Sequence, residues 1–131
     1  MSRIERFVKY AAVVSCFAVF STAQQAAEQP ETVMITFRAK SGAETELAHV
    51  IARHWTTARE LKLVREAPHV TIRGSEGERA YFIDIFTWRD ARTPDAAPAE
   101  ILKIWGEMNR LVEARGGHAG LEIAPVSVVA P

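Results

Sequence analysis

Residues 81–88 read Tyr-Phe-Ile-Asp-Ile-Phe-Thr-Trp, a run of aromatic and β-branched residues interrupted by one carboxylate. This composition is typical of a strand, which we place at about Arg79–Trp88. Successive side chains point to opposite faces of a strand. Both faces of this strand are therefore apolar: Phe82, Phe86 and Trp88 lie on one, and Tyr81, Ile83 and Ile85 on the other.

The flanking segments alternate between strand and helix patterns. They predict strands at Thr32–Ala39, His69–Arg73 and Leu121–Val129, and helices from Ser41 to about Leu61 and over about Ala99–Arg115. Ser41-Gly-Ala-Glu44 fits a capping box that opens the first helix, and Gly116-Gly117 fits the end of the second. The order β-α-β-β-α-β, with right-handed crossovers, gives a ferredoxin-like α+β sandwich. It has a four-stranded antiparallel sheet with two helices on one face.

Two helices cover only one face of such a sheet, and a sheet face that meets water should alternate between apolar and polar residues. The strand at 79–88 does not alternate, so its second face needs a cover that this chain does not supply. A second copy is the simplest cover. We therefore predict a homodimer with the sheets face to face, a dimeric α/β barrel.

The first 23 residues have the layout of a secretory signal peptide: basic residues, then an apolar run, then Ser21-Thr-Ala23. The apolar run is short for a permanent membrane span, which needs about 20 residues. We predict signal cleavage and export to the periplasm or medium, with an uncleaved anchor or lipidation at Cys16 as weaker alternatives. A loose leader at 24–31 and one domain at 32–129 would follow.

The bulk composition is that of an ordinary globular protein, with a formal net charge of zero at pH 7. A nucleic-acid-binding protein usually shows a basic excess or a basic face, so this class of partner is excluded. The one cysteine, Cys16, falls within the predicted signal peptide. The mature domain would therefore depend on its core, or on its core plus a partner, for stability.

Two polar residues are predicted to face the layer between helices and sheet. Asp84 shares a face with Phe86 and Trp88, and burial of an unpaired carboxylate is costly. His54 lies in the apolar stripe of the first helix, and neutral imidazole can accept a proton near pH 7. Either residue is a candidate catalytic base. The alternative for each is a satisfied structural residue of the core.

Aromatic and sulfur-containing side chains near these two residues could form a flat binding pocket. The candidates for substrate contact are Trp88, Trp105, Phe86, Met108 and Trp55; the alternative is that they simply fill the core. No metal site is predicted, because His49 and His54 would lie on different sides of their helix. The sequence also lacks a phosphate-binding loop and a nucleophile elbow.

The strand ending in Trp88-Arg89-Asp90, the βαββαβ order and the chain length resemble the antibiotic biosynthesis monooxygenase-like proteins of the dimeric α/β-barrel superfamily. The resemblance covers about Thr32 to Val129. It implies a pocket between the helices and the sheet, in a family with cofactor-free oxygenases of phenols and quinols and with haem-degrading enzymes. In haem-degrading relatives a Trp that Trp88 matches is functional, but they also use a His on the second helix. This chain has none there, which counts against haem degradation.

These observations predict a small exported homodimer that binds an aromatic or quinone-like molecule between helices and sheet. One hypothesis is an enzyme that oxygenates this molecule without a cofactor, with His54 or Asp84 as base and Trp88 and Trp105 holding the ring. The other is a non-catalytic ligand-binding or assembly protein. The fold alone does not decide between them, because one fold can host many functions.

Overall fold

A computed structural model of the protein describes residues 24–130. The signal peptide predicted for residues 1–23, with Cys16, lies outside this range. Residues 24–28, within the predicted leader, are helical. The elements that follow are β1 (Glu31–Arg38), α2 (Glu44–Glu60), β2 (Val64–Glu76), β3 (Arg79–Trp88), the 3₁₀ helix η1 (Thr93–Ala96), α3 (Ala99–Leu111) and β4 (Leu121–Pro125).

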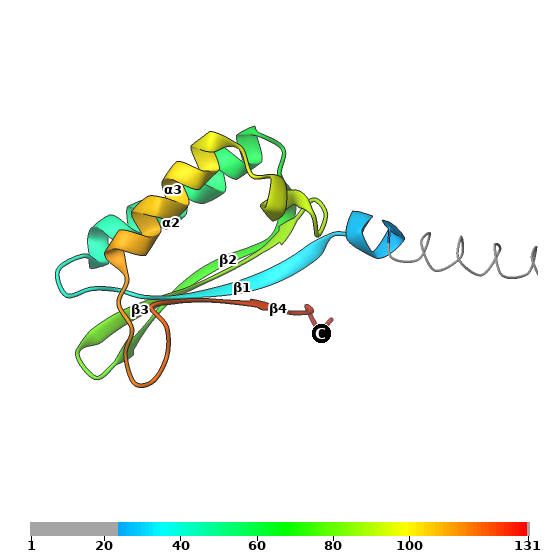
Figure 1. Cartoon of the computed structure of the whole chain (residues 1–131). Coiled ribbons are helices and arrows are strands. Elements are labelled where there is room, and N and C mark those ends of the chain that lie inside the picture. Colours follow the sequence, from blue (N-terminus) through cyan, green and yellow to red (C-terminus); the bar gives the residue numbers. More distant parts are fainter. Residues whose placement is uncertain (1–23, 131) are drawn as a thin grey trace, which may run out of the picture.

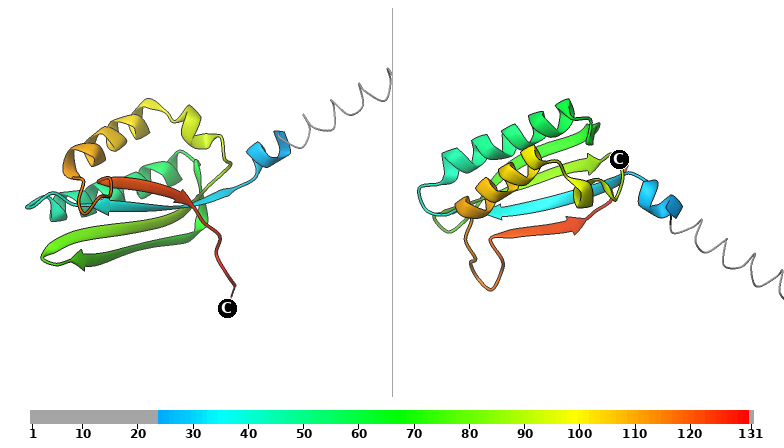
Figure 2. Two further views of the ribbon diagram at one scale, coloured as in Figure 1. Left: turned by 60° about the horizontal axis from the view of Figure 1, so that its bottom comes forward. Right: turned by 45° about the horizontal axis from the view of Figure 1, so that its top comes forward.

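The four strands form one antiparallel sheet in the order β2-β3-β1-β4. Helices α2 and α3 lie together on one face of this sheet (Figure 1). The two central strands, β1 and β3, run beneath the helices, while β2 and β4 form the two edges (Figure 2). The predicted ferredoxin-like α+β sandwich is confirmed.

Strand β3 occupies the predicted residues and buries every second side chain against the helices. Phe82, Phe86 and Trp88 point toward the helices, and so does Asp84. The neighbouring strand β1 continues this inner face, because its residues Val33 and Ile35 pair with Phe86 and Asp84. Residues 81–88 therefore form the sheet side of the core.

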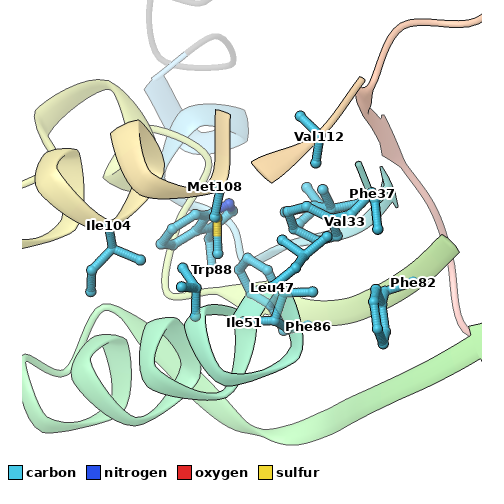
Figure 3. Packing of buried hydrophobic residues seen from close by; sticks show 13 residues of the cluster. Val33, Phe37, Leu47, Ile51, Phe82, Phe86, Trp88, Ile104, Met108 and Val112 are labelled. Atoms are coloured by element: carbon cyan, nitrogen blue, oxygen red, sulfur yellow. The ribbon is translucent and has the colours of Figure 1, made fainter. Parts of the chain in front are cut away.

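The core lies between this inner face and the two helices (Figure 3). The buried residues of α2 are Leu47, Val50, Ile51, His54 and Ala58, spaced by three and four as the sequence predicts. The buried residues of α3 are Ile101, Ile104 and Met108. Both helices thus present one apolar stripe to the sheet, and His54 is the one strongly polar side chain in either stripe.

Within residues 24–130, no helix lies over the opposite face of the sheet (Figure 1), which carries several apolar side chains besides threonines. The alternation and register place these side chains on it: Met34, Val70, Ile72, Ile83 and Ile85. Val70 is 47% exposed and Ile72 is 49% exposed. We call this set of five residues the open face.

The predicted capping box at the start of the first helix is wrong. Helix α2 begins at Glu44, and its N-cap is Ala43, whose side chain has no atom that could accept a hydrogen bond from the first-turn amides. Residues 41–43 instead form a turn in which Gly42 has a φ of 81° and the amide of Ala43 donates to the carbonyl of Lys40. This turn leaves Ser41 too early in the chain to cap the helix. The acidic residues of the first turn still interact favourably with the helix dipole.

The second helix is shorter than predicted, because α3 ends at Leu111 rather than near Arg115. The backbone there bonds to the chain that follows β1: the amide of Lys40 donates to Leu111, and the amide of Glu113 donates to Arg38. These bonds replace the next helical turn. Val112 is accordingly extended and contributes its side chain to the core.

The edge strands also differ from the prediction. Strand β2 is longer, starting at Val64, because Val64 pairs with Trp88 and His69 pairs with Phe86 across a bulge that holds extra residues. Strand β4 is shorter and ends at Pro125, followed by one more backbone bond to β1, in which the Val126 amide donates to the Thr32 carbonyl.

Candidate functional site

A cavity of about 290 Å³ lies between α3 and the part of the sheet formed by β1 and β4. Its wall is mostly apolar. The lining residues are Glu31, Val33, Ile35, Phe37, His54, Trp88, Pro94, Trp105, Met108, Asn109, Leu121 and Ile123. Concave sites of this kind, apolar with a few polar groups, are where proteins usually bind small molecules.

His54 is the ionisable group in the inner wall of this cavity. It lies in the buried stripe of α2 and is only 1% exposed. The indole Nε1 of Trp105 donates a hydrogen bond to its Nε2 at 3.1 Å. The edge of its ring meets Phe86 and Trp88 at centroid distances of 5.6 Å and 6.0 Å. Burial lowers the pKa of His54 from the usual 6.5 to about 4, with a smaller lowering effect from the charge of His69.

Two tryptophans and a methionine form the wall next to His54. Trp88 comes from the end of β3, and Trp105 and Met108 come from the inner side of α3. The rings of Trp88 and Trp105 are nearly perpendicular, 81° apart with a centroid distance of 6.3 Å. This geometry offers ring faces and edges to a flat ligand.

Glu31 and Asn109 supply the remaining polar side chains of the lining, from the start of β1 and the end of α3. Ile123, on the edge strand β4, is 62% exposed and belongs to the same lining. The exposure of Ile123 shows that the cavity opens toward the edge of the sheet at β4.

Asp84 belongs to a second cluster, outside the lining of the cavity. Its carboxylate Oδ1 accepts a hydrogen bond from Thr71 Oγ1 at 2.7 Å and lies 3.1 Å from His69 Nε2. The ring of Trp55 stacks on His69 with a centroid distance of 3.8 Å and an angle of 14°. Asp84 is thus a satisfied buried carboxylate, which matches the structural alternative described above.

Burial raises the pKa of the Asp84 carboxyl, while the hydrogen bond from Thr71 and the proximity of His69 act in the opposite direction. Phe86 lies between the two clusters, because its ring contacts both His54 and Trp55. The structure therefore separates the two candidate bases rather than bringing them together.

Of the seven residues proposed from the sequence, four line the cavity: His54, Trp88, Trp105 and Met108. Asp84, Phe86 and Trp55 lie behind this lining. Glu31, Pro94 and Asn109 also line the cavity and were not predicted from the sequence. The alternation of β1 does predict the inward direction of Val33, Ile35 and Phe37. The polar residues at the ends of β1 and α3 carry no comparable signal.

Within residues 24–130, no group of three or more His, Cys, Asp or Glu side chains is arranged to hold a metal ion. Over the same range, none of the helices combines the length and the apolar character needed to cross a membrane.

No family model matches the sequence, and no curated protein matches it. Solved structures do match the fold. Two structures of SnoaB, a cofactor-independent oxygenase from Streptomyces nogalater, align with TM-scores of 0.58 and 0.56 at 17% identity, covering 78% of this chain and 95% of theirs. A protein described as an antibiotic biosynthesis monooxygenase aligns with a TM-score of 0.57 at 12% identity, covering 78% of this chain and all of that one.

The chain shares the fold of these proteins. A dimeric ferredoxin-like protein of unknown function from Jannaschia sp. CCS1 shares it, with a TM-score of 0.56 at 19% identity over 76% of this chain and 100% of that one. The cavity of the present chain lies on the helix side of the sheet, where the resemblance in sequence implies a pocket.

Proposed function

We propose that the chain binds a small, uncharged aromatic hydroxy compound in the cavity and oxygenates it without a cofactor, with His54 as the base. One observation carries this proposal: a mostly apolar cavity of about 290 Å³ contains one buried imidazole beside two indole rings. The description of SnoaB as a cofactor-independent oxygenase supports the reaction type.

The size and charge of the cavity define the ligand class. Its volume lies at the lower end of the roughly 300–1,000 Å³ typical of small-molecule sites, which suits one or two fused rings. Its described lining contains no Lys or Arg that could pair with a carboxylate or phosphate, and it does contain Glu31. An anionic ligand would therefore lose its hydration without gaining a counter-charge. A neutral phenol or quinol carries no charge and avoids this desolvation cost.

In the proposed reaction the substrate itself supplies the electrons. The imidazole Nε2 of His54 takes the hydroxyl proton, and the electron-rich ring then reduces O₂ and forms a carbon–oxygen bond. One oxygen atom ends as the new quinone carbonyl, and the other leaves as water with two hydrogens from the substrate. A naphthol plus O₂ thus gives a naphthoquinone plus water. The apolar wall would exclude bulk water from the reacting ring.

Oxygen uptake with 1-naphthol, monitored together with quinone absorbance, tests this reaction. We expect uptake by the wild type and its loss in His54→Gln, because Gln cannot accept a proton near neutral pH. His49→Gln is the matched control, since His49 lies on the same helix, is exposed and is absent from the lining. Full activity in His54→Gln would exclude His54 as the base.

A second candidate function is ligand binding without turnover. It is favoured by the hydrogen bond from Trp105, which occupies His54 Nε2, and by the position of Asp84 outside the cavity. The two candidates differ in one measurement. Saturable binding of 1-naphthol by the wild type without oxygen uptake would establish the binding protein and reject the oxygenase.

We also propose that two copies pack through the open face. Its five side chains are apolar, and exposed apolar surface of this kind is usually covered by a partner. The dimeric neighbour from Jannaschia sp. CCS1 supports the same assembly. The cavity lies on the helix side of the sheet, opposite the open face. The proposed dimer would therefore not cover the opening of the cavity near β4.

Light scattering after size-exclusion chromatography tests the dimer. Ile72→Asp should yield monomers, because it would place a charge in the dimer interface. Leu102→Asp is the matched control: Leu102 is 54% exposed and Ile72 is 49% exposed, but Leu102 lies on α3. A dimer that survives Ile72→Asp and is lost with Leu102→Asp would move the interface from the sheet to the helices.

Export of the mature domain is a further proposal, supported by the pattern of residues 1–23 alone. Expression of the full chain in a bacterium, followed by cell fractionation and N-terminal sequencing, tests it. A mature protein that starts at Gln24 in the periplasm or medium is expected. An unprocessed chain in the cytosol would refute it.

A further inference from the structure

The nitrogen of His54 that faces Trp105 already has a hydrogen-bond partner. Trp105 Nε1 lies 3.1 Å from His54 Nε2, and an indole N–H can only donate. His54 Nε2 must therefore accept with its lone pair. In a neutral imidazole one nitrogen accepts and the other carries the proton. The ring proton of His54 is thus assigned to Nδ1.

This contact also opposes protonation of His54. A proton on Nε2 would face the indole N–H and leave two donors without an acceptor between them. The effect has the same direction as burial, which lowers the pKa of His54 to about 4. Trp105 therefore keeps the imidazole neutral, in the form a base requires, but blocks the nitrogen that would act.

Trp105 is placed where a ligand would meet it. It lies on α3 and lines the same cavity as His54, and it is only partly buried whereas His54 is 1% exposed. Its ring meets Trp88 edge-on across the wall. A ligand in this part of the cavity would therefore lie beside both the indole of Trp105 and the imidazole of His54.

We propose that Trp105 is a positioning residue that caps His54 in the free protein and is replaced at Nε2 by the hydroxyl of the bound aromatic ligand. This inference rests on the proposed function. On binding, the ligand hydroxyl donates to Nε2, and the freed indole N–H donates to the ligand oxygen. When the proton moves to Nε2, the electron pair stays on that oxygen, which the indole N–H then stabilises as a phenolate.

The tautomer of His54 gives a direct test on the ligand-free protein, from the imidazole ¹⁵N chemical shifts near neutral pH. We expect the Nδ1–H form in the wild type, and a population of the Nε2–H form in Trp105→Phe, which keeps a ring but has no N–H. Trp55→Phe is the matched control, because Trp55 is the helix neighbour of His54 but packs on His69. It should leave the tautomer unchanged.

A wild-type His54 found mainly as the Nε2–H form would overturn the assignment, and this measurement needs no variant to fold. A folded Trp105→Phe with an unchanged tautomer would also overturn it. Circular dichroism of each variant confirms folding before the spectra are compared.

The exchange step is tested by adding 1-naphthol or naphthalene to the wild type, followed through the indole proton of Trp105. Naphthol should move this resonance to a new position at saturation, while naphthalene, which has no hydroxyl, should leave the bond to His54 in place. Equal changes with both compounds, or no change with naphthol, would overturn the exchange. None of these spectra depends on turnover, so failure of the oxygenase proposal is seen separately, as the absence of oxygen uptake.

Discussion

Replacing His54 with Gln should remove a pH-dependent part of the folding stability. The pKa of His54 falls from 6.5 to about 4 in the folded protein because burial disfavours the imidazolium. Between these pH values the unfolded chain binds a proton that the folded protein does not. The free energy of unfolding is therefore highest above pH 6.5 and decreases as the pH falls toward 4. At about 1.4 kcal/mol per pKa unit, the full loss is about 3 kcal/mol.

Urea unfolding of the wild type and His54→Gln at several pH values between about 4 and 7 measures this loss. The free-energy difference between the two proteins should change by about 3 kcal/mol across the range, in the direction that disfavours the wild type at low pH. Other titrating groups, Asp84 included, contribute to both proteins and cancel. His49→Gln, an exposed histidine on the same helix, should follow the wild type. A constant difference between wild type and His54→Gln would refute the buried neutral imidazole.

Asp84→Ala should destabilise the protein by about 2–4 kcal/mol, because Thr71 and His69 lose their shared acceptor. Asp84→Asn keeps an acceptor and should destabilise the protein less. Urea unfolding measures both variants, and equal losses of stability would contradict the role of Asp84 as a shared acceptor. Gly120→Ala should cost about 1–3 kcal/mol, since the added Cβ would lie 2.8 Å from a backbone nitrogen of the preceding loop. Gly106→Ala, where the nearest atom is 3.9 Å away, should instead stabilise α3 by up to about 1 kcal/mol. Melting temperatures that shift in the same direction for both glycines would contradict the difference in packing.

The element order and the central strand were predictable because local pattern and tertiary position agree there. Strand β3 is apolar on both faces and bounded by turn residues, and its bounds are those predicted. The end of α3 was not predictable in this way. It depends on two backbone hydrogen bonds between segments far apart in the sequence: the Lys40 amide donates to the Leu111 carbonyl, and the Glu113 amide donates to the Arg38 carbonyl. Such long-range bonds do not change the spacing of apolar residues along the helix, so the sequence pattern does not reveal them.

The candidate site was predictable in part for the same reason. Helical spacing places His54 in the buried stripe, and strand alternation places Trp88 beside it. The partner of Asp84 depends on the exact register of the β2–β3 hairpin, because the turn between the paired residues Glu76 and Arg79 puts Thr71 opposite Asp84. The bond between Trp105 and His54 likewise depends on how two helices are rotated against each other.

The position of β1 also determines when the sheet can form. It is the first strand of the chain but lies in the centre, where Arg38 pairs with Tyr81 and Phe37 pairs with Leu121. Only the β2–β3 hairpin joins strands that are adjacent in sequence. Closing long loops before such contacts form is entropically costly and slows folding. The hairpin should therefore form early, and β1, which pairs with β3, should find its place only after the hairpin has formed.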